Sequence, residues 1–141
     1  MLYFDASVVA PLFVTDVHSQ VMHAWAANEA ESFVLSDFGA AEFAAVVTRA
    51  HRIGKLNTRD VAGAFADFDR WRSRWVTMRF VRSSDIEQCE NLIRDLKLKL
   101  SAPDALHLAI ARADQMTLVT LDQRQAAAAR MLRHPVLIPG R

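Results

Sequence analysis

The sequence predicts an α/β fold in three layers, with a mostly parallel sheet of about five short strands covered by helices on both faces. Short β-prone runs alternate with helical patterns along all 141 residues. Several of these runs are apolar on both faces, which is typical of strands buried in a parallel sheet. No internal repeat, low-complexity tract or linker divides the chain, so we expect one domain over residues 1–141.

The first third of the chain is predicted to hold two strands and three helices. In order, we expect a strand at 2–4, a helix at 6–14, a helix at 16–28, a strand at 32–35 and a helix that runs to about 52. Pro11 is expected to end or kink the first helix, and Ser36 or Asp37 to cap the third, before Gly54 ends it. The inner face of this third helix is expected to carry Phe38, Ala41, Ala45 and Val46.

The middle of the chain adds two helices and a strand. Thr58 is a candidate cap for a helix with an apolar stripe at Val61, Phe65, Phe68, Trp71 and Trp75. Residues 76–81 alternate loosely and are predicted to form the third strand. Ser84 and Glu87 have the spacing of a capping box. The helix after them has the strongest amphipathic pattern of the chain, at Ile86, Cys89, Ile93, Leu96 and Leu100.

A helix start, a buried helix and a strand follow each other near the C-terminus. Ser101 precedes Asp104 by three residues, which is the spacing of an N-cap and a first-turn acid. Residues 105–113 are apolar all round, so this helix is expected inside the molecule. Residues 118–121 are predicted to form a buried strand that ends on Asp122. The last elements expected are a helix at 123–132 and a strand at 135–138.

Four acids are expected to meet beyond the carboxyl ends of the strands, where sheets of this kind bind ligands. Asp5 and Asp122 each follow a strand directly. Glu42 follows the second strand within two helical turns, and Asp104 opens the helix that leads into a later strand. Taken singly, each acid has an ordinary alternative role as a helix cap, a first-turn residue or a surface residue.

Clustered carboxylates repel one another, which raises at least one pKa unless a cation is bound. Carboxylate and water oxygens select Mg²⁺ or Mn²⁺ over zinc, so the sequence favours one of these ions. His107 lies one helical turn after Asp104, as a ligand or as a packed, hydrogen-bonded support. A site of this kind suits hydrolysis of phosphodiester bonds.

The sequence lacks the motifs of several other classes of enzyme. The sequence contains no G-x-S-x-G elbow, no G-x-G-x-x-G fingerprint and no phosphate-binding P-loop. A haloacid dehalogenase would carry a second Asp two residues after Asp5, but Ser7 stands there.

Composition and charge exclude several further classes of protein. The net charge is +1, and 52% hydrophobic with 23% charged residues is typical of a soluble globular protein. Cys89 is the only cysteine, which excludes an intrachain disulfide and a thiolate metal site. Asp5 interrupts the N-terminal apolar run before a signal-peptide core could form, and no stretch approaches the roughly 20 apolar residues of a membrane span. We therefore expect a cytoplasmic protein that does not enter a membrane.

Basic residues gather in two parts of the chain. One group is Arg70, Arg72, Arg74, Arg79 and Arg82, and the other is Arg49, Arg52, Lys55 and Arg59. Such groups are usually solvated faces, and contact with a phosphate backbone is the alternative.

Four short motifs in order resemble those of PIN-domain ribonucleases, and specifically the VapC-type toxins of bacterial toxin–antitoxin pairs. The motifs are Tyr3–Ser7, Phe38–Phe43, Pro103–Ala109 and Leu118–Asp122. By this resemblance the metal-binding acids are Asp5, Glu42, Asp104 and Asp122, and the supporting residues are Ser7 and Thr120. After Asp122 a further acid found in some PIN nucleases is missing, which argues against a fully occupied second metal site.

The resemblance implies a PIN-like fold and an endoribonuclease, dependent on Mg²⁺ or Mn²⁺, that slows translation by cutting tRNA, rRNA or mRNA. Asp5, Asp104 and Asp122 would hold the catalytic metal, and Glu42 would share a second metal or orient water. It also implies a homodimer and a cognate VapB-type antitoxin whose C-terminal segment covers the acidic pocket. Two alternatives remain: a PIN nuclease of RNA maturation or decay, and a catalytically silent module that binds an antitoxin or RNA. The stripe at residues 61–75 is either a groove for the partner or part of the core.

Overall fold

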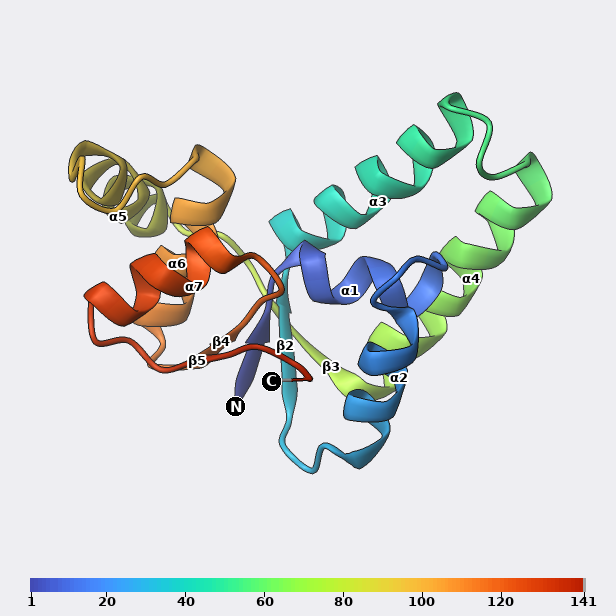
Figure 1. Ribbon diagram of the computed structural model, residues 1–141, viewed down its shortest axis with the longest axis horizontal. Coiled ribbons are helices and arrows are strands. Elements are labelled where there is room, and N and C mark those ends of the chain that lie inside the picture. The colour runs from blue at the N-terminus through green and yellow to red at the C-terminus, as the bar shows by residue number, and fades with distance from the viewer. Residues whose placement is uncertain (141) are drawn as a thin grey trace.

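Five short strands form one parallel sheet at the centre of the molecule, in the order β3-β2-β1-β4-β5 (Figure 1). The structure is a computed structural model that describes residues 1–140. The strands are β1 Leu2–Phe4, β2 Phe33–Ser36, β3 Val76–Arg79, β4 Thr117–Val119 and β5 Val136–Leu137. The predicted α/β fold with a parallel sheet of five short strands is confirmed.

Helices cover both faces of this sheet. Within residues 1–140 they are α1 Ala6–Phe13, α2 Ser19–Asn28, α3 Asp37–Arg52, α4 Thr58–Trp75, α5 Ser83–Arg94, α6 Ala102–Ala113 and α7 Gln123–Met131. Figure 1 shows α5, α6 and α7 on one side of the sheet and α1 to α4 on the other. None of these helices is both long enough and apolar enough to cross a lipid bilayer.

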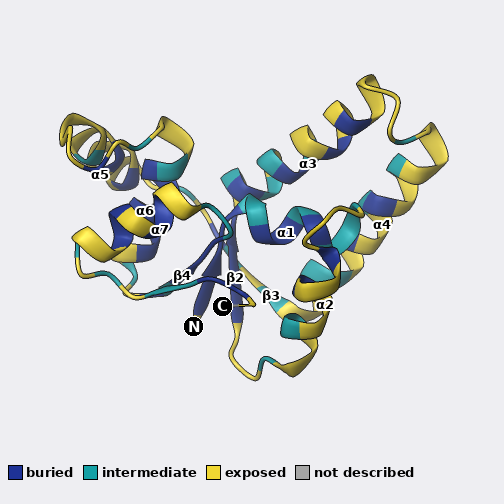
Figure 2. Ribbon diagram, viewed as in Figure 1, coloured by how far each residue is buried: buried dark blue, intermediate teal, exposed yellow. Residues whose placement is uncertain are grey.

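The core is divided into two clusters by the sheet. Successive side chains of β1 point to opposite faces, so Tyr3 packs with the α5–α7 layer while Leu2 and Phe4 pack with the α1–α4 layer. Both faces of β1 are buried, as the dark strand in Figure 2 shows. Residues 105–111 of α6 are also buried, which confirms that this helix lies inside the molecule.

Strand register brings three polar side chains to one edge. Phe4 pairs with Leu35 of β2 and with Val119 of β4. The residues that follow these three, Asp5, Ser36 and Thr120, therefore lie at the same carboxyl edge. Because every strand is parallel, α1, α3 and α7 all begin at this edge.

The predicted inner face of α3 is wrong. Val46 is 39% exposed, and Ala41 and Ala45 are exposed as well. Phe38 is half-buried and packs with the α5–α7 cluster. The buried stripe consists of Gly39, Phe43, Val47 and Ala50. The run of alanines in this helix gives almost no signal about which side faces the core, and the large side chain of Phe43 decides it.

Two predicted helix caps are also wrong. Asn57, not Thr58, caps α4, and its side chain accepts a hydrogen bond from the backbone of Asp60. At the start of α5 the predicted pair of Ser84 and Glu87 is also wrong. The cap residue is Arg82, and Asp85 accepts a hydrogen bond from its backbone N–H at 2.7 Å. Neighbouring candidates compete at both helix starts, and at α5 the Arg79 guanidinium also pairs with Asp85.

The amphipathic stripe predicted for residues 86–100 is interrupted. The helix α5 ends at Arg94, so Leu96 lies beyond it and is 85% exposed. Cys89 is buried, whereas Ile86 and Ile93 are largely exposed. The chain therefore keeps an apolar surface on this side.

One member of the first basic group is buried. The Arg79 guanidinium pairs with Asp85 and, through Nε at 2.8 Å, with Asp114. Arg79 thus connects β3 to the start of α5 and the end of α6. Arg79 is not part of a solvated basic face.

Candidate functional site

Asp5 stands at the centre of the carboxyl edge, directly after β1. Its Oδ1 accepts hydrogen bonds from the backbone N–H of Ser7 at 3.0 Å and from the Ser7 hydroxyl at 2.6 Å. Its Oδ2 accepts a hydrogen bond from the Thr120 hydroxyl at 2.8 Å. The residue is only 4% exposed. Both carboxylate oxygens therefore have a fixed direction.

The hydroxyls of Ser7 and Thr120 also join β1 to the chain after β4. Ser7 Oγ accepts a hydrogen bond from the backbone N–H of Leu121 at 2.9 Å. Thr120 Oγ1 accepts one from the backbone N–H of Asp122, also at 2.9 Å. Two short side chains thus set the position of the segment that carries Asp122 relative to Asp5.

Asp104 and Asp122 are both placed by helix starts. Ser101 caps α6 and donates its hydroxyl proton to Asp104 Oδ2 at 2.8 Å. Asp122 caps α7, and its Oδ1 accepts the backbone N–H groups of Arg124 at 2.7 Å and Gln125 at 3.1 Å. In the described residues the other carboxylate oxygen of each acid has no hydrogen-bond partner. Each acid is therefore anchored by one oxygen, and the second could contact a ligand.

Glu42 belongs to a buried chain of polar side chains. Its Oε1 contacts His107 Nε2, and His107 Nδ1 lies 2.7 Å from the Tyr3 hydroxyl. The Tyr3 hydroxyl also donates to Ser36 Oγ at 2.9 Å, so Glu42, His107, Tyr3 and Ser36 form one continuous hydrogen-bonded network. His107 is 2% exposed. The buried imidazole therefore fixes the position of the Glu42 carboxylate through one ring nitrogen and contacts Tyr3 through the other.

Burial and mutual repulsion perturb the acids. Burial raises the pKa of Asp5, although His107 and the hydrogen bonds from Ser7 and Thr120 oppose this rise. The pKa of Asp104 is also raised, first by burial and then by the charges of Asp122 and Glu42. Asp122 and Glu42 therefore lie within electrostatic reach of Asp104.

A hard divalent cation fits the chemistry of these donors. The site offers carboxylate oxygens, and among residues 1–140 no lysine or arginine forms an ion pair with any of the four acids. The same described residues contain no group of three or more His, Cys, Asp or Glu side chains already gathered in a metal-ligating arrangement. Side-chain rotation of the half-exposed acids would be needed to close a coordination sphere.

Sequence reasoning missed three residues that contribute to this edge. Tyr3 was assigned only to the first strand and the first motif, Ser36 only to a helix cap, and Gln125 only to the helix at 123–132. Gln125 is fully buried and donates its side-chain N–H to the main-chain oxygen of Asp104 at 3.2 Å. A glutamine within an otherwise small and apolar buried stripe is the signal that could have identified it.

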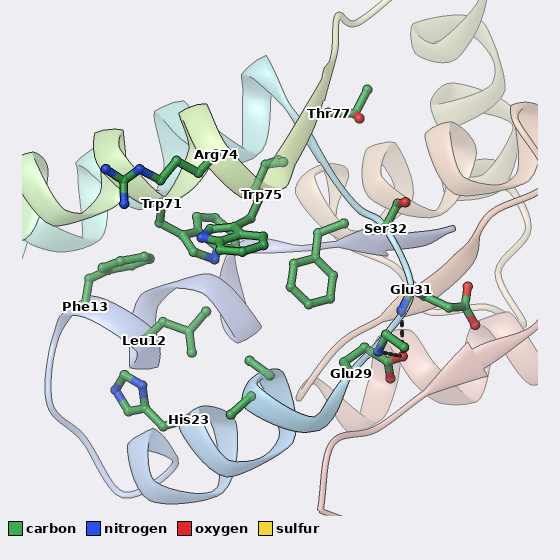
Figure 3. A pocket seen from close by; sticks show the side chains of 15 residues that line it. Leu12, Phe13, His23, Glu29, Glu31, Ser32, Trp71, Arg74, Trp75 and Thr77 are labelled. Atoms are coloured by element: carbon green, nitrogen blue, oxygen red, sulfur yellow. Dashed lines mark hydrogen bonds between the residues drawn. The ribbon is translucent and has the colours of Figure 1, made fainter.

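A cleft of about 780 Å³ lies at the opposite end of the sheet, where β2 and β3 begin (Figure 3). Its aromatic walls come from Phe13 at the end of α1, Phe33 of β2, and Trp71 and Trp75 of α4. Trp75 is 67% exposed, whereas Phe68 and Trp71 belong to the core cluster or pack against it. The stripe on α4 is thus mainly core, with an exposed aromatic end.

Comparisons with known proteins agree on the fold. The sequence matches the PIN domain family over residues 2–131. No curated protein sequence matches the chain.

Three solved structures illustrate the likeness. VapC20 of Mycobacterium tuberculosis, a Sarcin-Ricin loop cleaving toxin, has a TM-score of 0.72 at 21% identity, over 91% of this chain and 95% of that one. FitAcB from Neisseria gonorrhoeae has a TM-score of 0.72 at 17% identity, over 97% and 96%. VapBC2 from Rickettsia felis, bound to a DNA fragment from its promoter, has a TM-score of 0.68 at 16% identity, over 99% of both.

Proposed function

We propose that the chain, which belongs to the PIN domain family, is a metal-dependent endoribonuclease that acts as the toxin of a toxin–antitoxin pair. One observation carries the proposal. Asp104, Asp122 and Glu42 each have one oxygen held by a neighbouring group, beside the fully anchored Asp5, and no lysine or arginine among residues 1–140 pairs with any of them. The similar fold of VapC20, a Sarcin-Ricin loop cleaving toxin, supports RNA as the substrate.

The chain's own residues would divide the work as follows. Asp5, Asp104 and Asp122 would hold Mg²⁺ or Mn²⁺, with Ser7 and Thr120 fixing the direction of the Asp5 oxygens. When bound, such an ion lowers the pKa of a water and stabilises the charge that develops on the phosphate. Glu42, supported by His107, would orient the attacking water or share a second ion.

The test is RNA cleavage with a matched pair of variants. Purified protein is incubated with total RNA with and without Mg²⁺, and the new 5′ ends are mapped. Asp104→Asn should abolish cleavage, because the neutral amide is a much weaker ligand for a hard cation. Asp95→Asn, at an exposed position beyond α5, is the control and should cleave as the wild type does. Cleavage by folded Asp104→Asn, or equal cleavage in EDTA, would refute the proposal.

An antitoxin is the expected partner, and the aromatic cleft is the proposed place for an apolar segment of it. The helix α1 begins at Asp5 and ends at Phe13, which lines the cleft. One peptide lying along α1 could therefore fill the cleft and reach the acids, where an arginine would pair with the carboxylates. A toxin–antitoxin complex from Klebsiella pneumoniae, with a TM-score of 0.63 at 16% identity, supports a partner of this kind.

The same proposal includes a homodimer. It also treats residues 1–141 as a single domain. The exposed apolar side chains of Phe80, Ile86 and Leu96 offer a surface that a second copy could cover. Light scattering of the purified protein measures the oligomeric state. Ile86→Glu should convert a dimer of this kind into a monomer, whereas a dimer that persists would place the interface elsewhere.

A further inference from the structure

Gln125 joins the two segments that carry Asp104 and Asp122. Its backbone N–H donates to Asp122 Oδ1 at 3.1 Å, and its side-chain Nε2 donates to the main-chain oxygen of Asp104 at 3.2 Å. The side chain is completely buried. One residue therefore contacts both acids, through its backbone in one case and its side chain in the other.

The position of Gln125 in α7 makes this contact possible. It is the third helical residue after the cap, where a glutamine side chain usually reaches back to the backbone N–H of the cap residue. Here the cap residue is Asp122, and its N–H donates instead to Thr120 Oγ1 at 2.9 Å. The Gln125 amide is thereby available to reach across to α6.

The oxygen of the Gln125 side-chain amide has no hydrogen-bond partner among the described residues. Gln125 Oε1 is buried and makes no hydrogen bond within the described part of the chain. Turning the amide over would bring Oε1 against the carbonyl oxygen of Asp104, and two acceptors repel. The bridge to Asp104 thus fixes an orientation that leaves Oε1 unpaired, and a buried unpaired acceptor lowers stability. Local costs of this kind are found mainly at functional sites.

We propose that Gln125 is a positioning residue that sets the separation of Asp104 and Asp122 for the divalent cation. The inference rests on the proposed function, because it concerns the same metal site. Two carboxylates that repel each other move apart unless the main chain beneath them is held, and the Gln125 bridge holds α6 to α7 at this point. Gln125 would act through Asp104 and Asp122, which would hold the ion, and not as a ligand.

The test compares Gln125→Met with the wild type. Methionine has nearly the same length and volume, but it can neither donate to Asp104 nor leave a buried amide oxygen unpaired. Gln88→Met is the control, because Gln88 is exposed on α5. Three quantities are measured: the Tm in EDTA, the Kd for Mn²⁺ by calorimetry, and the KM for RNA.

We expect the Tm of Gln125→Met in EDTA to lie within about 3 °C of the wild-type value or above it, because the lost bond and the removed unpaired oxygen offset each other. The Kd for Mn²⁺ should rise about tenfold or more, as it does when other residues that hydrogen-bond to metal ligands are replaced. The KM for RNA should change little. Gln88→Met should match the wild type in all three quantities.

A Kd for Mn²⁺ within about threefold of the wild-type value would overturn the inference, whatever the Tm. If Gln125→Met does not fold, Gln125→Leu is measured against the same limits. Failure of the proposed function looks different: the wild type itself would then bind no Mn²⁺, before any substitution is made, and the inference would fall with it.

Discussion

Thr120→Val tests the site with a minimal change of shape. Valine keeps the volume of threonine but removes the hydroxyl that donates to Asp5 Oδ2 at 2.8 Å and accepts from the backbone N–H of Asp122 at 2.9 Å. Thr120 is fully buried, so water cannot replace either bond. The variant therefore leaves a buried carboxylate oxygen and a backbone donor without their partner.

The loss of unfolding free energy follows from these two bonds. A hydrogen bond to a charged group contributes about 1.5–3 kcal/mol, and a neutral one about 0.5–1.5 kcal/mol. The added apolar methyl offsets part of this, so we expect a net loss of about 2–4 kcal/mol. Domains of this size are stable by about 5–15 kcal/mol, so the variant should still fold, with a Tm lower by about 7–13 °C.

Urea unfolding at pH 7 in EDTA measures this loss, with Thr120→Ser as the control. Serine keeps the hydroxyl and loses only a methyl, so it should retain most of the stability. The same pair measured in an Asp5→Asn background forms a double-mutant cycle, in which the cost of Thr120→Val should shrink. A loss below about 0.5 kcal/mol, or equal losses for valine and serine, would refute the role given to this hydroxyl.

Three further outcomes are expected from the contacts of other residues. Asp5→Asn should gain stability relative to the wild type as the pH rises above the ordinary carboxyl pKa of 3.8. Burial raises the pKa of Asp5, so above this pH the unfolded wild type loses a proton that the folded wild type keeps. A difference in unfolding free energy between the two proteins that does not change with pH in metal-free urea titrations would contradict this. Arg79→Met should cost about 3–5 kcal/mol in urea unfolding, since it leaves the buried Asp85 carboxylate without its guanidinium, and a cost below about 1 kcal/mol argues against it. Trp75→Ala should leave the Tm nearly unchanged but weaken antitoxin binding in calorimetry, and unchanged affinity would remove the cleft as the docking place.

The order of strands and helices could be predicted because its signals are local. Short apolar runs gave the strands to within a few residues, and Ser36 and Ser101 cap α3 and α6 as their sequence context indicates. The inner face of α3 was missed because the alanines around Glu42 carry little information about which side is buried. The caps of α4 and α5 were missed because adjacent residues can serve equally well in an isolated helix.

The contacts at the candidate site could not be predicted in the same way. Asp5 and Thr120 are separated by 115 residues, and Tyr3 and His107 by 104, so no local pattern relates them. The sequence pointed to Asp5 and Asp122 because each directly follows a predicted strand, and to Glu42 and Asp104 because each lies early in a helix next to a strand. It did not reveal what holds each acid, since Tyr3 and Gln125 look like ordinary strand and helix residues until the fold brings their partners close.

Hydrolysis of RNA at this site requires that these carboxylates bind a divalent cation. Crystals grown with Mn²⁺ and measured at an energy where manganese scatters anomalously test the binding most directly. We expect one strong anomalous peak bounded by oxygens of Asp5, Asp104 and Asp122, and its loss in Asp5→Asn. A wild-type map without a peak there, with the three carboxylates directed away from one another, would contradict it.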